Sequence, residues 1–300
     1  MQHRLLLISC ALLGAVSAAL HAQSLAEHGT APAVAPDGQT IAFLSNRNGD
    51  RALYVMNADG SNVRRLYGDN AMQGRPFWTR DGRHVLSATR NGDTSVVRSY
   101  SLDGSAPVDV ARIVAFPGGP VPFEDLSRFV YGVGTWRQTQ LETARFDGTD
   151  RRRLTSDPAT HWCASPSPSG DRIAVGRRDD VTWQIWVVNA DGSDGRAITR
   201  FTRADGSAEC PRWSPDETRI AFQNGTIFPG DTTKRTSQIR IINAAGGTAL
   251  MIAPHAEPWQ DEMPSWFPDG KRLVFQSNRT GTWEIWTMNA DGSDQHPLTR

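Results

Sequence analysis

The chain of 300 residues lacks an excess of charge of either sign. Its 32 lysines and arginines balance 32 aspartates and glutamates. A dedicated nucleic-acid-binding protein carries a basic excess or a basic patch, so the balance argues against that class. Apolar residues make up 38% and charged residues 21% of the chain. These fractions exclude both an intrinsically disordered chain and a membrane-embedded bundle.

Long apolar runs are also missing, except for one at the N-terminus. The run from Leu5 to Leu20 has about 16 residues, which is short for a membrane-spanning helix. Arg4 precedes it and the small residue Ala22 follows it, as in a secretory signal peptide. We expect cleavage after residue 22 and a periplasmic or secreted protein without a membrane span. An uncleaved anchor, or lipidation at Cys10, is the alternative.

Catalytic and cofactor motifs are scarce as well. The sequence contains no Gly-x-Ser-x-Gly elbow of a serine hydrolase and no glycine-rich phosphate loop. The segment from Asn57 to Asn62 resembles the start of a calcium loop but lacks the closing bidentate glutamate. We interpret this segment and its copies from Asn189 and Asn289 as hairpin turns.

What the sequence has in abundance is a repeat. Asp-Gly pairs recur every 44 residues, at Asp59, Asp103, Asp147 and Asp191. Ala245 and Asp291 hold the same place in two further copies. An earlier turn, Pro-Asp-Gly in its clearest form, aligns at Asp37, Asp81, Asp125, Ser169, Asp216 and Asp269. Six copies are therefore present.

Each copy contains four short segments with alternating apolar residues, such as Ile41 and Phe43 or Leu273 and Phe275. Alternation with a period of two, bounded by Asp-Gly turns, is typical of antiparallel strands in hairpins. Four strands at this repeat length predict a propeller blade. The sequence therefore predicts an all-β fold, a six-bladed β-propeller of four-stranded antiparallel blades, with a β-sandwich as the alternative. After the signal peptide (1–22) and a short segment (23–29), the blades are expected at about 30–73, 74–117, 118–161, 162–208, 209–261 and 262–300.

The ring is expected to close in phase. Blade one begins near Pro32 with its own first strand, and blade six ends near Leu298 with its own fourth strand. Only the segment 23–29 is left over. Closure should then depend on packing between blades one and six and not on a shared sheet.

The repeat resembles the Pro-Asp-Gly propeller repeat of the TolB family, which is also described as WD-repeat-like. The resemblance covers about residues 30–300 and is carried best by copies one, five and six, such as Pro268-Asp269-Gly270. It implies a periplasmic protein and a Pal-like lipoprotein as a partner. TolB proteins also carry an N-terminal α/β domain, for which the segment 23–29 is too short, so the resemblance is limited to the propeller.

The two faces of such a ring differ in this sequence. The Pro-Asp-Gly and Asp-Gly turns must lie on one face, called here the turn face. The second connection of each blade and the link to the next blade lie on the other, called here the link face. All length changes fall on the link face, including seven extra residues around 228–234. Because loops accept insertions and carry function, we expect the link face to be the functional one; neutral insertion is the alternative.

Polar residues gather on the link face. Some of them precede the first strands and should ring one mouth of the central channel, and arginines lie in the second connections. The candidate partner-binding residues are His28, Arg47, Arg90, His161, Glu209, Asp261, Glu262 and Arg279. The arginines suit acidic groups on a partner. We expect no cofactor and no metal site, with a divalent cation held by the His, Asp and Glu side chains as the alternative.

Of three cysteines, Cys163 and Cys210 remain after signal cleavage. Each lies five residues before its repeat's anchor proline, Pro168 or Pro215, so they occupy equivalent positions in adjacent blades. Paired thiols tend to oxidise outside the cytoplasm, and a bridge requires Cα atoms about 4.4–6.8 Å apart. We expect a disulfide if both residues lie close to the channel; two buried free thiols are the alternative.

Together these features predict an exported, non-enzymatic propeller that binds a protein or an envelope component through its link face. The alternative is a metal-dependent carbohydrate-active enzyme, because oligogalacturonate lyases resemble this repeat and hold a metal through channel histidines. His28 and His161, with His255 nearby in the link, are the candidates for that role.

Overall fold

The computed structural model describes residues 26–68, 72–92, 94–114, 119–135, 137–180, 182–227 and 235–300. The predicted signal peptide (1–22), with the alternative lipidation site Cys10, and the insertion at 228–234 lie outside these residues. The described chain folds into six four-stranded antiparallel sheets. Nowhere in these residues does a helix occur that is long and apolar enough to span a membrane.

The first three sheets follow one another along the chain. Blade one contains β1 (Thr30–Val34), β2 (Thr40–Ser45), β3 (Ala52–Asn57) and β4 (Arg64–Gly68). Blade two contains β5 (Met72–Trp78), β6 (His84–Asn91), β7 (Thr94–Ser101) and β8 (Val108–Val114). Blade three contains β9 (Val121–Pro122), β10 (Arg128–Thr135), β11 (Gln138–Arg145) and β12 (Arg152–Arg153).

The other three sheets continue in the same order. Blade four contains β13 (Thr160–Pro166), β14 (Arg172–Arg178), β15 (Trp183–Asn189) and β16 (Arg196–Ala197). Blade five contains β17 (Ser207–Trp213), β18 (Arg219–Ile227), β19 (Arg235–Asn243) and β20 (Leu250–Met251). Blade six contains β21 (Asp261–Trp266), β22 (Arg272–Ser277), β23 (Glu284–Asn289) and β24 (His296–Pro297).

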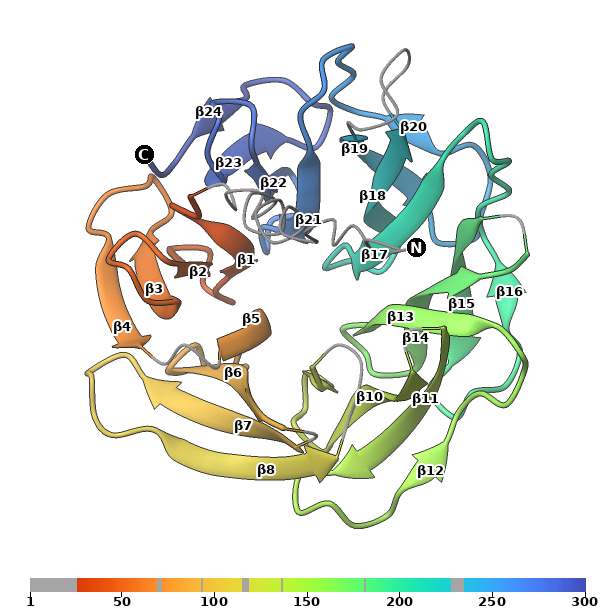
Figure 1. Cartoon of the computed structure of the whole chain (residues 1–300), viewed down its shortest axis with the longest axis horizontal. Coiled ribbons are helices and arrows are strands. Elements are labelled where there is room, and N and C mark those ends of the chain that lie inside the picture. The colour runs from red at the N-terminus through yellow and green to blue at the C-terminus, as the bar shows by residue number, and fades with distance from the viewer. Residues whose placement is uncertain are drawn as a thin grey trace, which may run out of the picture.

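Each blade has its first strand at the centre of the ring and its fourth at the rim (Figure 1). This arrangement confirms the six-bladed propeller predicted from the repeat. Every sheet is built from four consecutive strands, so no sheet is shared between blades one and six. Apolar side chains such as Phe43, Phe267 and Leu298 form one buried cluster across that junction.

The residues before β1 add hydrogen bonds to this junction. Gly29 donates its amide to the carbonyl of Trp283, and Trp283 donates to Ala26, each over 2.9 Å. Glu27 and Trp283 form a single parallel bridge beside β23, whereas the outer strand of blade six remains β24. Ser237 and Gln260 form the same bridge between blades five and six. The segment that leads into blade one therefore contacts blade six in the same way as the link before blade six contacts blade five.

The Pro-x-Trp positions join neighbouring blades through their indoles. Trp78 Nε1 donates to the carbonyl of Ala33 over 2.9 Å, and Trp213 Nε1 to that of Ser165 over 3.0 Å. Trp266 repeats the contact one blade further on. A buried indole N–H needs a partner, and here the partner is always the first strand of the preceding blade.

A bulge interrupts the first strand in five blades. Its leading residue has a positive φ, at Ala31, Gly74, Cys163, Cys210 and Met263. Bulges re-aim side chains, and here they do so beside the channel. Blade two differs from the others, because three residues (74–76) lie between the paired Gln73 and Phe77.

Candidate functional site

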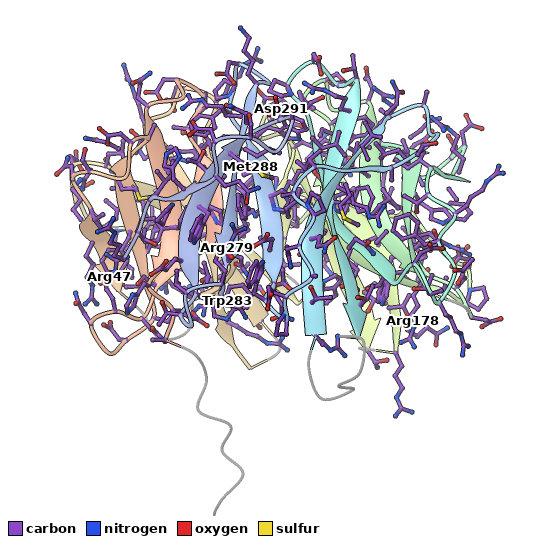
Figure 2. All side chains as sticks on the ribbon, turned by 90° about the horizontal axis from the view of Figure 1, so that it is seen from above. Arg47, Arg178, Arg279, Trp283, Met288 and Asp291 are labelled. Atoms are coloured by element: carbon purple, nitrogen blue, oxygen red, sulfur yellow. A yellow bond between two sulfur atoms is a disulfide. The ribbon has the colours of Figure 1, made fainter. Side chains whose placement is uncertain are left out.

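The two faces of the propeller can be recognised by their residues in the side view. Asp291, in an Asp-Gly turn, lies at one face, and Arg47, Trp283 and Arg178 lie toward the opposite one (Figure 2). The first is the turn face and the second is the link face. The first strands of the blades surround the central axis that runs between the two faces (Figure 1).

On the link face, Asp261 is completely buried at the start of blade six. Arg279 donates from Nη2 to Asp261 Oδ2 over 2.7 Å and from Nε to Ser277 Oγ over 3.0 Å. His255 Nε2 lies 3.6 Å from the same carboxylate oxygen. The guanidinium of Arg279 also stacks on Trp286, 4.3 Å from the ring centroid. Arg279 is thus engaged within the protein and neutralises Asp261.

Arg47 holds the equivalent place in blade one. It donates from Nε to Ser45 Oγ over 3.0 Å and from Nη2 to the carbonyl of His28. Its guanidinium lies 5.2 Å from the ring centroid of Tyr54, and burial lowers its pKa. Both arginines therefore hold the segment that leads into a blade against the second connection of that blade.

Of the other predicted basic residues, Arg90 and His161 lie in other blades, whereas His28 contacts Arg47 through its carbonyl. Arg90, at the end of β6, donates from Nε to the carbonyl of Gly92 over 2.7 Å. His161 is 2% exposed, with Nδ1 3.2 Å from the carbonyl of Thr139, and burial lowers its pKa. It belongs to the wall between blades three and four. His28 is half-buried, with its Nδ1 unpartnered.

Glu209 and Glu262 lie in the first strands of the neighbouring blades five and six, close enough for their charges to interact. They pair with Gln223 and Gln276 respectively, one position before the bulge in each blade. Burial, with a smaller contribution from the charges of Glu209 and Asp261, raises the pKa of Glu262 to about 7, although a hydrogen bond from Gln276 lowers it. These residues define the link-face mouth (Glu209, Asp261 and Glu262), which carries carboxyl groups, and among them Glu262 has its pKa raised to about 7.

The described residues contain no group of three or more His, Cys, Asp or Glu arranged to hold a metal ion. Of the three histidines considered for a lyase site, His28 leads into blade one, His161 lies in β13 and His255 lies in the link before β21.

The structure joins Cys163 and Cys210 in a disulfide, with their Cα atoms 4.8 Å apart. Both are leading bulge residues with positive φ, which turns their side chains toward one another at the innermost part of adjacent blades. The bridge links β13 to β17 and so clamps blades four and five beside the link-face mouth.

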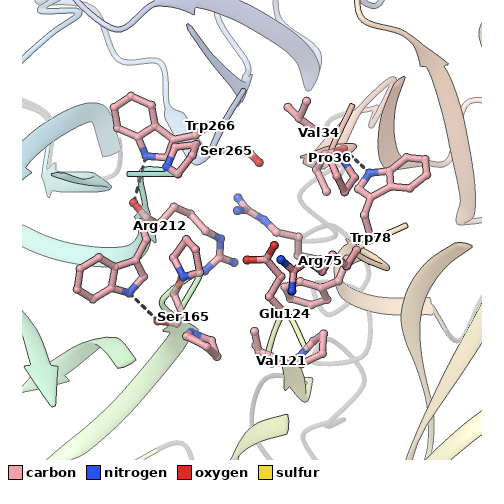
Figure 3. A pocket seen from close by; sticks show the side chains of 18 of the residues that line it. Val34, Pro36, Arg75, Trp78, Val121, Glu124, Ser165, Arg212, Ser265 and Trp266 are labelled. Carbon is pink, nitrogen blue, oxygen red and sulfur yellow. Dashed lines mark hydrogen bonds between the residues drawn. The ribbon is translucent and has the colours of Figure 1, made fainter. Parts of the chain in front are cut away.

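A second concave site lies at the other end of the channel. The turn-face pocket has a volume of about 390 Å³ and is rimmed by the first turns, including Pro36, Pro168, Pro215 and Pro268. Arg75 and Arg212 extend into it from the first strands of blades two and five (Figure 3). This pocket was not predicted from the sequence, although the additional residue before Pro76 distinguishes blade two from its neighbours.

The fold defines a closed six-bladed β-propeller with charged side chains at both ends of its central axis. The chain belongs to the TolB beta propeller domain family, whose profile matches residues 127–300. That match covers blades four to six and most of blade three.

Individual relatives agree with this assignment. The chain is 29% identical over 202 residues to the Tol-Pal system protein TolB of Anaeromyxobacter dehalogenans, covering 63% of this chain and 41% of that protein. Crystalline TolB from Acinetobacter baumannii superimposes with a TM-score of 0.71 at 15% identity, covering 88% of this chain and 64% of that one. An oligogalacturonate lyase in complex with manganese shares the fold, with a TM-score of 0.57 at 15% identity and 89% of each chain covered.

The match is partial in length. The chain spans between one fifth and about two thirds of the first curated relatives that it matches. The similarity to the solved structures, at these identities, shows the fold alone.

Proposed function

We propose that this chain is an exported, non-enzymatic TolB-type propeller that binds a protein of the cell envelope through its link face. The observation that carries the proposal is the acidic mouth formed by Glu209 and Glu262 between blades five and six. Two carboxyl groups at equivalent positions, one with its pKa raised to about 7, offer acceptors to cationic or hydrogen-bonding groups of a partner.

The surroundings of this mouth support the choice of face. Arg279 and Asp261 fix the segment that leads into blade six, and the disulfide fixes blade five to blade four. A partner would therefore meet a preorganised surface, and less binding energy would be lost in ordering it. The relatives named for the Tol-Pal system support a Pal-type lipoprotein as the partner and the periplasm as the location.

The test is a binding measurement with purified components. The protein without residues 1–22 is titrated with the soluble domain of the Pal-type lipoprotein from the same bacterium, by isothermal titration calorimetry. We expect saturable binding that weakens at least tenfold in the double variant Glu209→Gln/Glu262→Gln. A matched double variant on the turn face, Asp37→Asn/Asp269→Asn, should bind like the unaltered protein, since both aspartates are exposed.

Two outcomes would contradict the proposal. Absence of binding would rule out the Pal-type partner, and equal loss in both double variants would rule out the link face as the binding surface. The same preparation, incubated with oligogalacturonate with and without Mn²⁺, should release no unsaturated product. Cleavage would assign the chain to the enzymatic alternative.

A further inference from the structure

Arg75 is a buried cation, and two of the three nitrogens of its guanidinium group have no hydrogen-bond partner. The residue is 7% exposed, and its Nη1 donates to the carbonyl of Pro264 over 2.9 Å. Its Nε and Nη2 are buried without a hydrogen-bond partner. These two N–H groups form one edge of the guanidinium plane, the edge that binds a carboxylate through two parallel hydrogen bonds.

Arg212 adds a second positive charge to the same pocket. Its Nη1 donates to the carbonyl of Pro211 over 2.8 Å. Neither Arg75 nor Arg212 takes part in an ion pair among the described residues. Burial lowers the pKa of both arginines, and the charge of Arg212 lowers the pKa of Arg75 further. Two uncompensated cations facing one pocket favour a bound anion.

The pocket suits an anion attached to an apolar body. Its volume of about 390 Å³ falls within the range of small-molecule sites. Prolines and the side chains of Phe77, Trp78, Trp213 and Trp266 form much of the wall. Such a wall offers few polar contacts to a bare inorganic ion. It can instead bury the hydrocarbon part of a ligand that carries an anionic group.

Two further charged residues line the opening. Glu124 and Arg80 are exposed at the rim of the pocket. In Figure 3 the Glu124 side chain points toward the arginines. Glu124 therefore competes with an incoming anion by its charge, whereas Arg80 attracts it from the edge.

We propose that the turn-face pocket binds a carboxylate carried on an apolar body, held side-on by Nε and Nη2 of Arg75 with Arg212 as the second positive charge. The ligand chemistry is that of a protein C-terminus ending in an apolar residue, or of a small aromatic or aliphatic carboxylic acid. This site is separate from the acidic mouth on the link face and does not depend on the function proposed there.

The test uses N-acetyl-L-phenylalanine as the probe and its amide as the uncharged match, with binding followed by calorimetry or ligand-detected NMR. The acid should bind and the amide should bind at least about tenfold more weakly, because the charged hydrogen bonds are lost. Arg75→Gln and Arg75→Lys should both weaken binding about tenfold, since lysine keeps the charge but lacks the planar edge.

Two further variants leave the buried Arg75 in place, so their effects on affinity do not depend on whether a change at Arg75 disturbs the fold. Glu124→Gln removes the competing carboxylate at the rim and should strengthen binding severalfold. Arg178→Gln removes an exposed charge on the opposite, link face and should change affinity by less than about twofold. The tripeptide acetyl-Ala-Ala-Phe, with a free carboxyl terminus, separates the two sources: tighter binding than the single residue indicates protein C-termini, and equal binding indicates a small acid.

The proposal is overturned if the amide binds as well as the acid, or if Arg75→Lys and Glu124→Gln both leave the affinity unchanged. Inorganic phosphate that binds while acetylphenylalanine does not would also overturn it, because the apolar wall would then contribute nothing.

Discussion

The side chain of Arg75 reaches from blade two to blade six and donates to the carbonyl of Pro264 over 2.9 Å. Pro264 and Glu262 both belong to β21, and the turn-face residue Pro268 follows two residues after the end of that strand. The basic pocket that Arg75 lines and the acidic mouth at Glu262 therefore contact the same strand, β21. This polarity gives the channel two chemically distinct ends, which can be tested separately.

The disulfide is testable by thiol counting. The protein without its first 22 residues should show no alkylatable thiol until a reductant is added, because Cys163 and Cys210 are bonded. Loop-closure entropy for a sequence separation of 47 residues gives a stabilisation of about 4 kcal/mol. The double variant Cys163→Ser/Cys210→Ser should lose stability of that order in chemical denaturation. Two reactive thiols without reductant would contradict the bridge.

Glu262 should make stability depend on pH. Its pKa is raised in the folded protein to about 7 from an ordinary value of 4.5, so the folded state favours the protonated form. Its contribution to stability is complete below about pH 4.5 and is lost as the pH rises through 7. We expect a loss of about 2 kcal/mol across this window, reduced by residual solvent contact.

Glu262→Gln isolates this contribution. The variant should gain stability relative to the unaltered protein at pH 8 and lose the advantage at pH 4, as measured by denaturation at both values. Exposed Glu257 provides the control, and Glu257→Gln should preserve the original pH profile. If Glu262→Gln leaves the dependence of stability on pH unchanged, the carboxyl group of Glu262 is not buried as described.

Arg279 should be needed for stability. Arg279→Gln leaves the fully buried Asp261 without its 2.7 Å ion pair, which should cost about 3 kcal/mol. Adding Asp261→Asn should recover part of the loss by removing the unpaired charge. Arg178→Gln, at an exposed arginine, should change the free energy of unfolding by less than about 0.5 kcal/mol. Equal effects at the two arginines would contradict the role given to Arg279.

Export is a further prediction from the N-terminal sequence. Mass spectrometry of protein from the envelope fraction should give a mature N-terminus close to Gln23, since Ala22 ends the signal-like segment. Intact Met1 in cytoplasmic protein would contradict it.

The blades were predictable because their signals are local. Alternation such as Ile41 and Phe43, preceded by the turn Asp37-Gly38, needs only neighbouring residues, and the 44-residue spacing counts the copies. The equivalence of Cys163 and Cys210 likewise follows from distance to a proline along the chain.

The roles of the arginines could not be predicted in this way. Whether Arg47 and Arg279 face a partner or the protein depends on the segments that pack against them from elsewhere in the sequence, such as His28 and Asp261. The reach of Arg75 to Pro264 joins residues 189 apart, and the bulge that permits it appears only when strand pairing is known.

Hydrogen–deuterium exchange with and without the Pal-type domain tests the central claim most directly, because it locates the binding face. The account predicts slower exchange in the link-face segments 26–29 and 255–262 and no change in the first turns at 36–38 and 268–270. Protection confined to those first turns, or no protection in either set of segments at saturating partner, would contradict it.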